Sequence, residues 1–229
     1  MVFFYFFFLP IHRGMKTLFF VTVISLMALL SFAQVAGGLK AGFNASTFGG
    51  DMEERSDLRL RPGFHFGASV NIPINAKLSV QPELLFSMVG AKWEEGYELE
   101  NSDLVKLEIV ENLTYICMPL SMIYSFGRFN IHGGPQVSLL LAASDDVTML
   151  RVTGGNTIIT AGLARDAGNL KKVDAGLNFG PGVDFGNFGI SARYYLGLTN
   201  LMADDEANDN ARVTNRGFQV SLMYKFSDQ

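Results

Sequence analysis

The chain has 229 residues and a formal net charge of −4 at pH 7, with charged residues at 17%. A typical globular domain has about 25% charged residues, so this composition is unusually apolar. The acidic balance argues against a nucleic-acid-binding protein, which would carry a basic patch. The single cysteine, Cys117, excludes an intrachain disulfide framework and is expected to be a small buried filler.

The start of the chain predicts a segment that is removed on export. From Met15 the sequence reads "MKTLFFVTVISLMALLSFAQ", with a lysine before an unbroken apolar run and a small-x-small motif ending at Ala33. This is the pattern of a secretory signal peptide. We expect residues 15–33 to be that peptide and residues 1–14 to reflect a start codon assigned too early. A retained membrane anchor is the alternative.

The remaining residues, 34–229, alternate apolar and polar side chains with the period of two that is typical of β-strands. The alternating segments are longer than most globular strands, which average about 5 to 6 residues. A tilted strand needs about 9 to 11 residues to cross a bilayer. The predicted strands are 38–47, 62–72, 77–90, 111–126, 128–142, 171–186, 187–199 and 214–226.

The connections between these segments alternate in length. "PINA", "GR" and "GN" predict tight turns, and longer polar loops are expected at about 48–61, 91–110, 143–170 and 200–213. The 143–170 loop either extends two strands or forms a small hairpin. Short turns at one end and long loops at the other are the layout of an outer-membrane barrel. We therefore predict an all-β fold, a single antiparallel up-and-down transmembrane β-barrel of about eight strands.

The two faces of the predicted strands differ in character. One face is apolar without an ionisable interruption, and the other carries amides, hydroxyls and charges, including Glu83. Strand length and the signal peptide favour a barrel with its apolar face toward lipid and its polar face toward a filled lumen. A soluble barrel with the faces reversed is the alternative. The predicted lumen ionic network comprises Lys40, Lys77, Glu83, Asp174, Asp184, Arg193 and Lys225.

Four prolines fall inside predicted strands, where proline cannot donate to the ladder. They are Pro82, Pro119, Pro135 and Pro181. We expect local bulges at these positions that bend the strands.

Several stretches resemble a known family. "GLKAGFNAST", "SVQPELLFSMVGAK", "IHGGPQVSLLLA" and the closing "FQVSLMYKF" are similar to the PorT-like, porin-family outer-membrane β-barrel proteins of Bacteroidetes-type bacteria. The resemblance covers nearly all of residues 34–229 in order. It implies an outer-membrane barrel, mostly without an assigned substrate, and one namesake is linked to protein secretion.

No catalytic pattern is present: there is no Ser-His-Asp order and no G-x-S-x-G elbow, so we expect no enzyme and no cofactor. His65 and His132 are lone histidines on different strands, for which a structural place in the lumen is favoured over a metal site or a general base. The acidic loops could instead hold a divalent cation. The residues considered for that are Glu94, Glu95, Asp204 and Asp205.

The functional expectation is an integral protein of the cell outer membrane with a structural or binding role and at most a narrow conduit. Its expected partners are outer-membrane lipid and lipopolysaccharide, through bridging cations, and the barrel-assembly machinery. Two alternatives stay open: a transport or protein-secretion accessory that acts through its long loops, and a soluble periplasmic ligand-binding barrel. A small-barrel enzyme would require a catalytic cluster on the loops, and none is apparent in the sequence.

Overall fold

The computed structural model describes residues 36–51, 58–98, 104–153, 156–161, 165–166, 170–202 and 212–226. The expected signal peptide at 15–33 and the expected misassigned start at 1–14 lie outside these residues.

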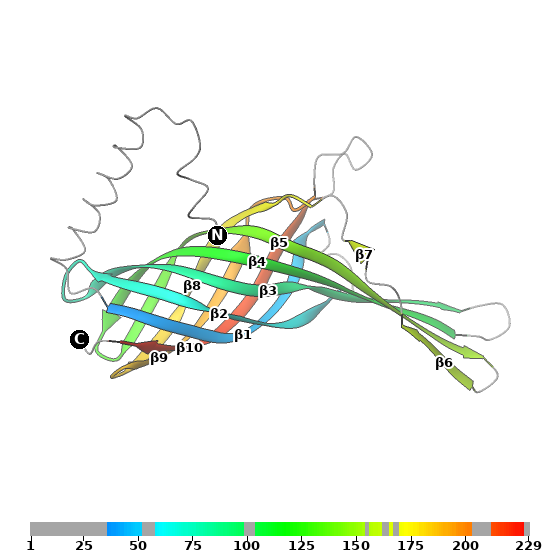
Figure 1. The fold of residues 1–229 in the computed structure, drawn as a ribbon, viewed down its shortest axis with the longest axis horizontal. Helices are drawn as coiled ribbons and strands as arrows, with labels where there is room; N and C mark the ends of the chain where they lie inside the picture. Colours follow the sequence, from blue (N-terminus) through cyan, green and yellow to red (C-terminus); the bar gives the residue numbers. More distant parts are fainter. Residues whose placement is uncertain are drawn as a thin grey trace, which may run out of the picture. The chain divides into compact units, whose positions relative to one another are not determined.

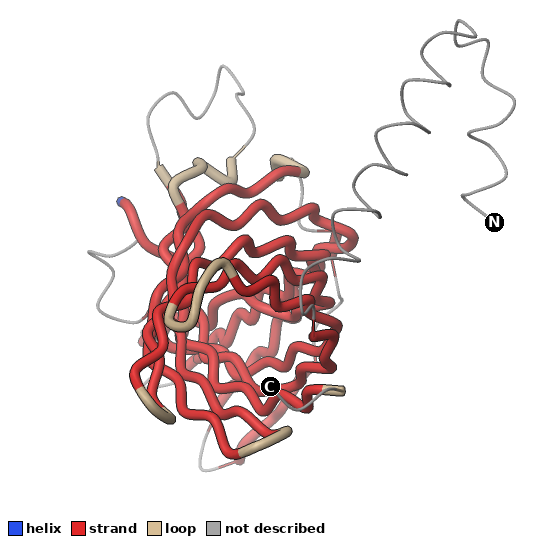
Figure 2. The backbone as a smooth tube through the Cα atoms, turned by 90° about the vertical axis from the view of Figure 1, so that its left-hand side faces the viewer, coloured by secondary structure: helices blue, strands red, loops and turns tan. Residues whose placement is uncertain are grey.

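Eight strands form a closed antiparallel ring, as the sequence predicted (Figure 2). Each strand pairs with its neighbours along the ring, and the pairing of β1 with β10 and of β4 with β5 closes it. Closure leaves no free sheet edge around the barrel wall. The strands of the ring are β1 (Ala36–Gly50), β2 (Leu58–Pro73), β3 (Leu78–Glu98), β4 (Leu104–Phe126), β5 (Phe129–Thr153), β8 (Val173–Phe185), β9 (Phe188–Gly197) and β10 (Val213–Lys225).

Tight turns join β2 to β3, β4 to β5 and β8 to β9, all at one end of the barrel. Gly127 and Gly186 lie in two of them with φ values of 68° and 57°, a left-handed conformation that glycine adopts without steric cost. These are the "GR" and "GN" turns expected from the sequence. In outer-membrane barrels the short turns face the periplasm, so the opposite end is extracellular.

Three strands continue past the ring at the extracellular end (Figure 1). Strand β2 pairs with β3 only as far as Trp93, yet β3, β4 and β5 continue and β6 (Asn156–Ala161) adds to β5. The short β7 (Arg165–Asp166) pairs with β5 nearer the ring. We call residues 94–98, 104–108, 148–153 and 156–161 the extracellular extension.

The extracellular extension corrects the loop prediction for 91–110, which is mostly a β-hairpin. Val105, Leu107 and Ile109 continue the period-two pattern among the acids, and β-branched and aromatic residues favour strands. For 143–170 both expected forms occur, because β5 lengthens and then turns into β6.

The outer face of the ring is apolar. Phe43, Phe218 and Leu222 have exposed fractions of 76%, 57% and 52%, and many other large apolar side chains on every strand are similarly exposed. An apolar band around a closed barrel is the surface that contacts lipid. The soluble-barrel alternative required this face to point inward, and the structure places Glu83 inside instead. Among the described residues, no helix has the length and apolar character needed to cross a membrane.

The bulges predicted at the in-strand prolines are wrong. The prolines concerned are Pro82, Pro119, Pro135 and Pro181. The strand register is the same on both sides of each, as where Pro82 stands opposite Leu120 in an otherwise continuous alignment. A missing N–H therefore interrupts the ladder locally without inserting a residue. Register shifts occur instead after Leu60 in β2 and after Thr114 in β4.

Candidate functional site

Polar side chains fill the inside of the barrel. A ring of eight strands is just wide enough for side chains to occupy its interior, and here these side chains are amides, hydroxyls, imidazoles and charges. Alternation along each strand places them inward while their apolar neighbours face outward. The buried polar residues of the lumen include Lys40, Asn44, His65, Ser69, Gln81, Glu83, Ser87, Ser121, Asn130, His132, Gln136, Ser138, Asp174, Asn178, Arg193, Gln219 and Ser221.

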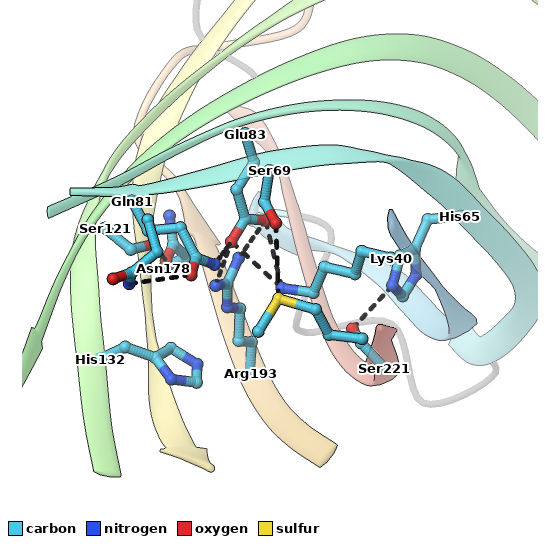
Figure 3. A network of polar contacts seen from close by, with 12 residues as sticks. Lys40, His65, Ser69, Gln81, Glu83, Ser121, His132, Asn178, Arg193 and Ser221 are labelled. Carbon is cyan, nitrogen blue, oxygen red and sulfur yellow. Dashed lines mark hydrogen bonds and ion pairs between the residues drawn. The ribbon is translucent and has the colours of Figure 1, made fainter. Parts of the chain in front are cut away.

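The centre of this lumen is an ion-pair cluster around Glu83 (Figure 3). Arg193 donates from Nη1 to Oε2 at 2.8 Å and from Nη2 to Oε1 at 2.6 Å, a bidentate pair. Lys40 Nζ lies 3.2 Å from both carboxylate oxygens, and Gln81 Nε2 donates to Oε1 at 2.7 Å. Strands β1, β3 and β9 supply the three charged residues, so the cluster ties opposite walls of the barrel together.

A second hydrogen-bonded group surrounds His65. Its Nε2 lies 2.8 Å from Ser221 Oγ, and its Nδ1 lies 2.7 Å from Asn44 Oδ1. Because the amide nitrogen of Asn44 donates to Ser87 Oγ at 2.9 Å, its oxygen is the acceptor and His65 Nδ1 carries a proton. Both ring nitrogens of His65 are thus engaged with protein groups, which agrees with a structural role.

Asp174 belongs to a different layer of the lumen. Its Oδ2 accepts hydrogen bonds from Tyr195 Oη at 3.1 Å and from Asn215 Nδ2 at 2.9 Å. The Asn215 amide also lies 3.3 Å from Tyr115 Oη. Only a small cavity of about 20 Å³ remains beside these residues, too little for a through-going water path.

Apolar side chains cap the lumen at its extracellular end. Leu85, Leu113 and Tyr115 are each at most 2% exposed and pack in one cluster. Cys117 belongs to the same cluster, which confirms its expected role as a buried filler. The other members are Phe48, Ala91, Leu201 and Val213. An ion that moved along the barrel axis would have to pass both this apolar cap and the charged cluster.

The residues of the predicted lumen network do not form a single unit in the structure. Lys225 Nζ pairs with Asp184 Oδ1 at 2.9 Å, partly exposed near the short turns, and Lys77 is exposed in the β2–β3 turn. Asp174 is held by hydroxyl and amide donors. These groups are separate because they lie at different positions along the barrel axis. Side chains on one face interact only where the strand register places them at the same position.

A polar cluster also lies at the extracellular rim, beyond the roughly 9 to 11 residues that cross the bilayer. Glu111 on β4 lies opposite Asp145 on β5. Burial and then the nearby charge of Asp145 raise the pKa of Glu111 to about 7. Arg61 Nε donates to Asn112 Oδ1 at 2.8 Å, and Asn112 Nδ2 donates to Asp146 Oδ2 at 2.8 Å. Burial lowers the pKa of the Arg61 guanidinium, an effect that the charge of Asp146 opposes.

The structure does not describe the side chains of the residues predicted as cation ligands. Glu94 and Glu95 are strand residues of β3 whose side chains are not described, and Asp204 and Asp205 lie outside the described residues. In the part of the chain that is described, no three His, Cys, Asp or Glu side chains come together in a way that would hold a metal ion.

Gln81, Tyr195 and Asn215 take part in the lumen contacts but were not among the residues of the predicted network. Side chains alternate along each strand, and these three residues occupy positions whose side chains point into the lumen. Only the pairing of distant strands shows that Gln81 joins Glu83 and that Tyr195 and Asn215 join Asp174.

Comparisons with solved structures find other outer-membrane proteins at low identity. Ail of Yersinia pestis, solved with the heparin analogue sucrose octasulfate, is 12% identical, with 84% of this chain and 99% of that chain covered and a TM-score of 0.38. Neisserial surface protein A is 12% identical, with 83% and 97% covered and a TM-score of 0.40. An outer membrane channel of Pseudomonas putida is 8% identical, with 84% and 95% covered and a TM-score of 0.30. A search of curated proteins gave no match.

The family comparison covers most of the chain. Residues 32–203 match the family described as "Outer membrane protein beta-barrel domain". The matched residues include strands β1 to β9, with the apolar outer band and the filled polar lumen described above. The protein is an integral barrel of the outer membrane, and its chain belongs to the outer membrane protein beta-barrel domain family.

Proposed function

We propose that this protein serves the outer membrane as a structural or binding protein, without catalytic activity and without an open channel. The observation that carries the proposal is the double closure of the lumen. Lys40 and Arg193 form ion pairs with Glu83 across the barrel. The apolar cluster around Leu113 and Tyr115 covers the lumen on the extracellular side of these pairs. A pore for solutes would need a continuous polar path, which this packing opposes.

The extracellular extension supports a binding role. Strands β3, β4 and β5 run past the ring and, with β6, present a small sheet beyond the membrane. The partner we propose is lipopolysaccharide, bridged through divalent cations to the acidic extracellular surface. On the finer family assignment, we propose a PorT-like, porin-family member, based on the stretches of sequence noted above. Folding by the barrel-assembly machinery is part of the same proposal.

A second candidate, a transport or protein-secretion accessory, is favoured by the same extension. Edge strand β6 is bonded to β5 on one side. An exposed edge is able to accept a strand from another protein. The two candidates differ in partner, because one requires lipopolysaccharide and the other a protein of the envelope.

Conductance tests the closed lumen. We expect the purified full chain, reconstituted in planar bilayers in 1 M KCl, to give no stepwise openings at ±100 mV, while a general porin in the same apparatus gives them. Regular openings of wild-type protein would contradict the proposal.

Lipopolysaccharide binding is tested by heat-modifiable gel mobility. Lipopolysaccharide with Mg²⁺ should raise the unfolding temperature of the barrel, and EDTA should abolish the rise. A rise that persists in EDTA would contradict cation bridging, and no rise at all would favour the protein-partner candidate.

A further inference from the structure

A polar cavity of about 120 Å³ lies beneath the central ion pairs and reaches the short-turn end of the barrel. Exposed residues of the β2–β3 turn, Asn75 and Lys77, line its mouth. Lys40, His132 and Arg193 line its inner part, and all three are at least nine-tenths buried. Because the short turns face the periplasm, this cavity opens to the periplasm.

The charges around the cavity do not balance. Glu83 is the one carboxylate that Lys40 and Arg193 share, so this buried cluster has a net charge of +1. The acid that lines the cavity, Asp184, is matched by Lys225 at 2.9 Å. An unmatched buried charge is unfavourable in an environment of low dielectric constant. A bound anion would balance it.

Two buried nitrogen atoms in the wall have no hydrogen-bond partner among the residues that the structure describes. They are Arg193 Nε and His132 Nε2, on side chains that are 3% and 6% exposed. Arg193 Nε is an N–H donor that requires an acceptor. His132 Nδ1 lies 3.4 Å from Asn130 Oδ1, and Asn130 Nδ2 donates to Asp184 Oδ2, so Oδ1 is the acceptor. His132 Nε2 is then free to bond a ligand hydroxyl.

Figure 3 shows His132 and Arg193 projecting into the lumen below the Glu83 carboxylate. We propose that this periplasm-facing cavity binds a small tetrahedral oxyanion of the hydrogen phosphate type. In its singly charged dihydrogen form the ion balances the +1 of the Lys40–Glu83–Arg193 cluster, its oxygens accept from Arg193 Nε and Lys40, and one hydroxyl donates to His132 Nε2. The cavity of about 120 Å³ is large enough to hold a small ion of this kind.

The binding test uses the folded full chain in micelles of a detergent without phosphate, so that no lipid headgroup supplies the anion. Inorganic phosphate is titrated against potassium chloride at constant ionic strength, and heat release and unfolding temperature are measured. A ligand that binds only the native state stabilises it. We expect saturable heat release and a rise of about 3 °C in unfolding temperature near saturation.

Two variants locate the site. Lys40→Met leaves Arg193 and Glu83 as a balanced pair, and Ser191→Asp places a carboxylate in the cavity wall to replace the ligand. Both should lose the phosphate response. Lys172→Met, the same substitution at an exposed lysine near the extracellular end, should keep it.

The proposal is overturned if wild-type protein shows no phosphate response beyond that of chloride. It is also overturned if Ser191→Asp responds as strongly as wild type. Ser191 is partly exposed on the cavity wall, so its variant decides the matter even if Lys40→Met fails to fold.

Discussion

Arg193 and Glu83 meet through two parallel hydrogen bonds of 2.8 and 2.6 Å, although 110 positions separate them in the sequence. They stand on β9 and β3, which are opposite walls of the ring. The pair therefore acts as a brace across the barrel. Its fork geometry explains why arginine rather than lysine suits this position, since a guanidinium matches both carboxylate oxygens at once.

Removing the shared carboxylate should strongly destabilise the barrel. Glu83→Gln leaves Lys40 and Arg193 buried as neighbouring cations, and breaking a buried pair in this way costs about 3 to 5 kcal/mol. Urea unfolding in micelles, followed by heat-modifiable gel mobility, measures the change. The control is Glu108→Gln, because Glu108 pairs with Lys92 in a more exposed setting where such a pair is worth about 0 to 1 kcal/mol. Equal losses in the two variants would show that the lumen pair has no bracing role.

A charged substitution on the outer face should distinguish positions that contact lipid from positions that face water. Leu222 on β10 and Met149 in the extracellular extension are 52% and 42% exposed. Leu222→Arg should cost about 2 to 4 kcal/mol of unfolding free energy, because arginine on the lipid face is expensive near the bilayer midplane. Met149→Arg should change it by less than about 0.5 kcal/mol, as for most water-exposed substitutions. Unfolding in phospholipid bilayers measures both, and a large loss from Met149→Arg would place the extension in lipid.

Stability should fall as pH rises because of Glu111. Its pKa is raised from the usual 4.5 to about 7 in the folded state by burial and then by Asp145. Between these values the folded state holds a proton that the unfolded state releases, so the contribution is full below about pH 4.5 and is lost as pH passes through 7.

Glu111→Gln should remove this pH dependence and raise the unfolding free energy at pH 8 by on the order of 2 kcal/mol relative to wild type. Urea midpoints at pH 5 and pH 8 measure it. Glu108→Gln, on the same strand but more exposed, should keep the wild-type difference. An unchanged pH dependence in Glu111→Gln would assign the effect to another group.

A methyl group at Gly42 should disrupt the wall beside His65. A Cβ there would lie 2.0 Å from the Val220 carbonyl oxygen and 2.8 Å from His65 Cε1, so the backbone would have to move. We expect Gly42→Ala to cost about 1 to 3 kcal/mol. Gly133→Ala is the matched control, because its nearest contact would be 3.2 Å, to the Asn178 oxygen, and should be tolerated with a smaller loss. Urea unfolding that ranks the two in the opposite order would contradict this account of close strand approach.

Much of the fold was readable from the sequence because the signal is local. Each predicted strand falls within an observed one or differs from it only at the ends, and the "GR" and "GN" turns lie where expected. That Lys40, Glu83 and Arg193 lie on the polar face of their strands follows from the alternation along each strand alone. The length of β3 to β5 was underestimated, since the acids of residues 94–108 masked an alternation that continues through them.

The sequence by itself determined the strands and which residues share each face, because a period of two places alternate side chains on opposite sides of a strand. The structure then showed that the polar face points into the lumen. The sequence did not determine which charges meet. That Glu83 receives both Lys40 and Arg193, while Asp174 is bonded by Tyr195 and Asn215, depends on the register between strands far apart in the chain. A shift of two residues in one strand pairing would keep each side chain on its side of the wall but change which side chains lie opposite one another. Only the tertiary structure therefore decides the chemistry of the lumen.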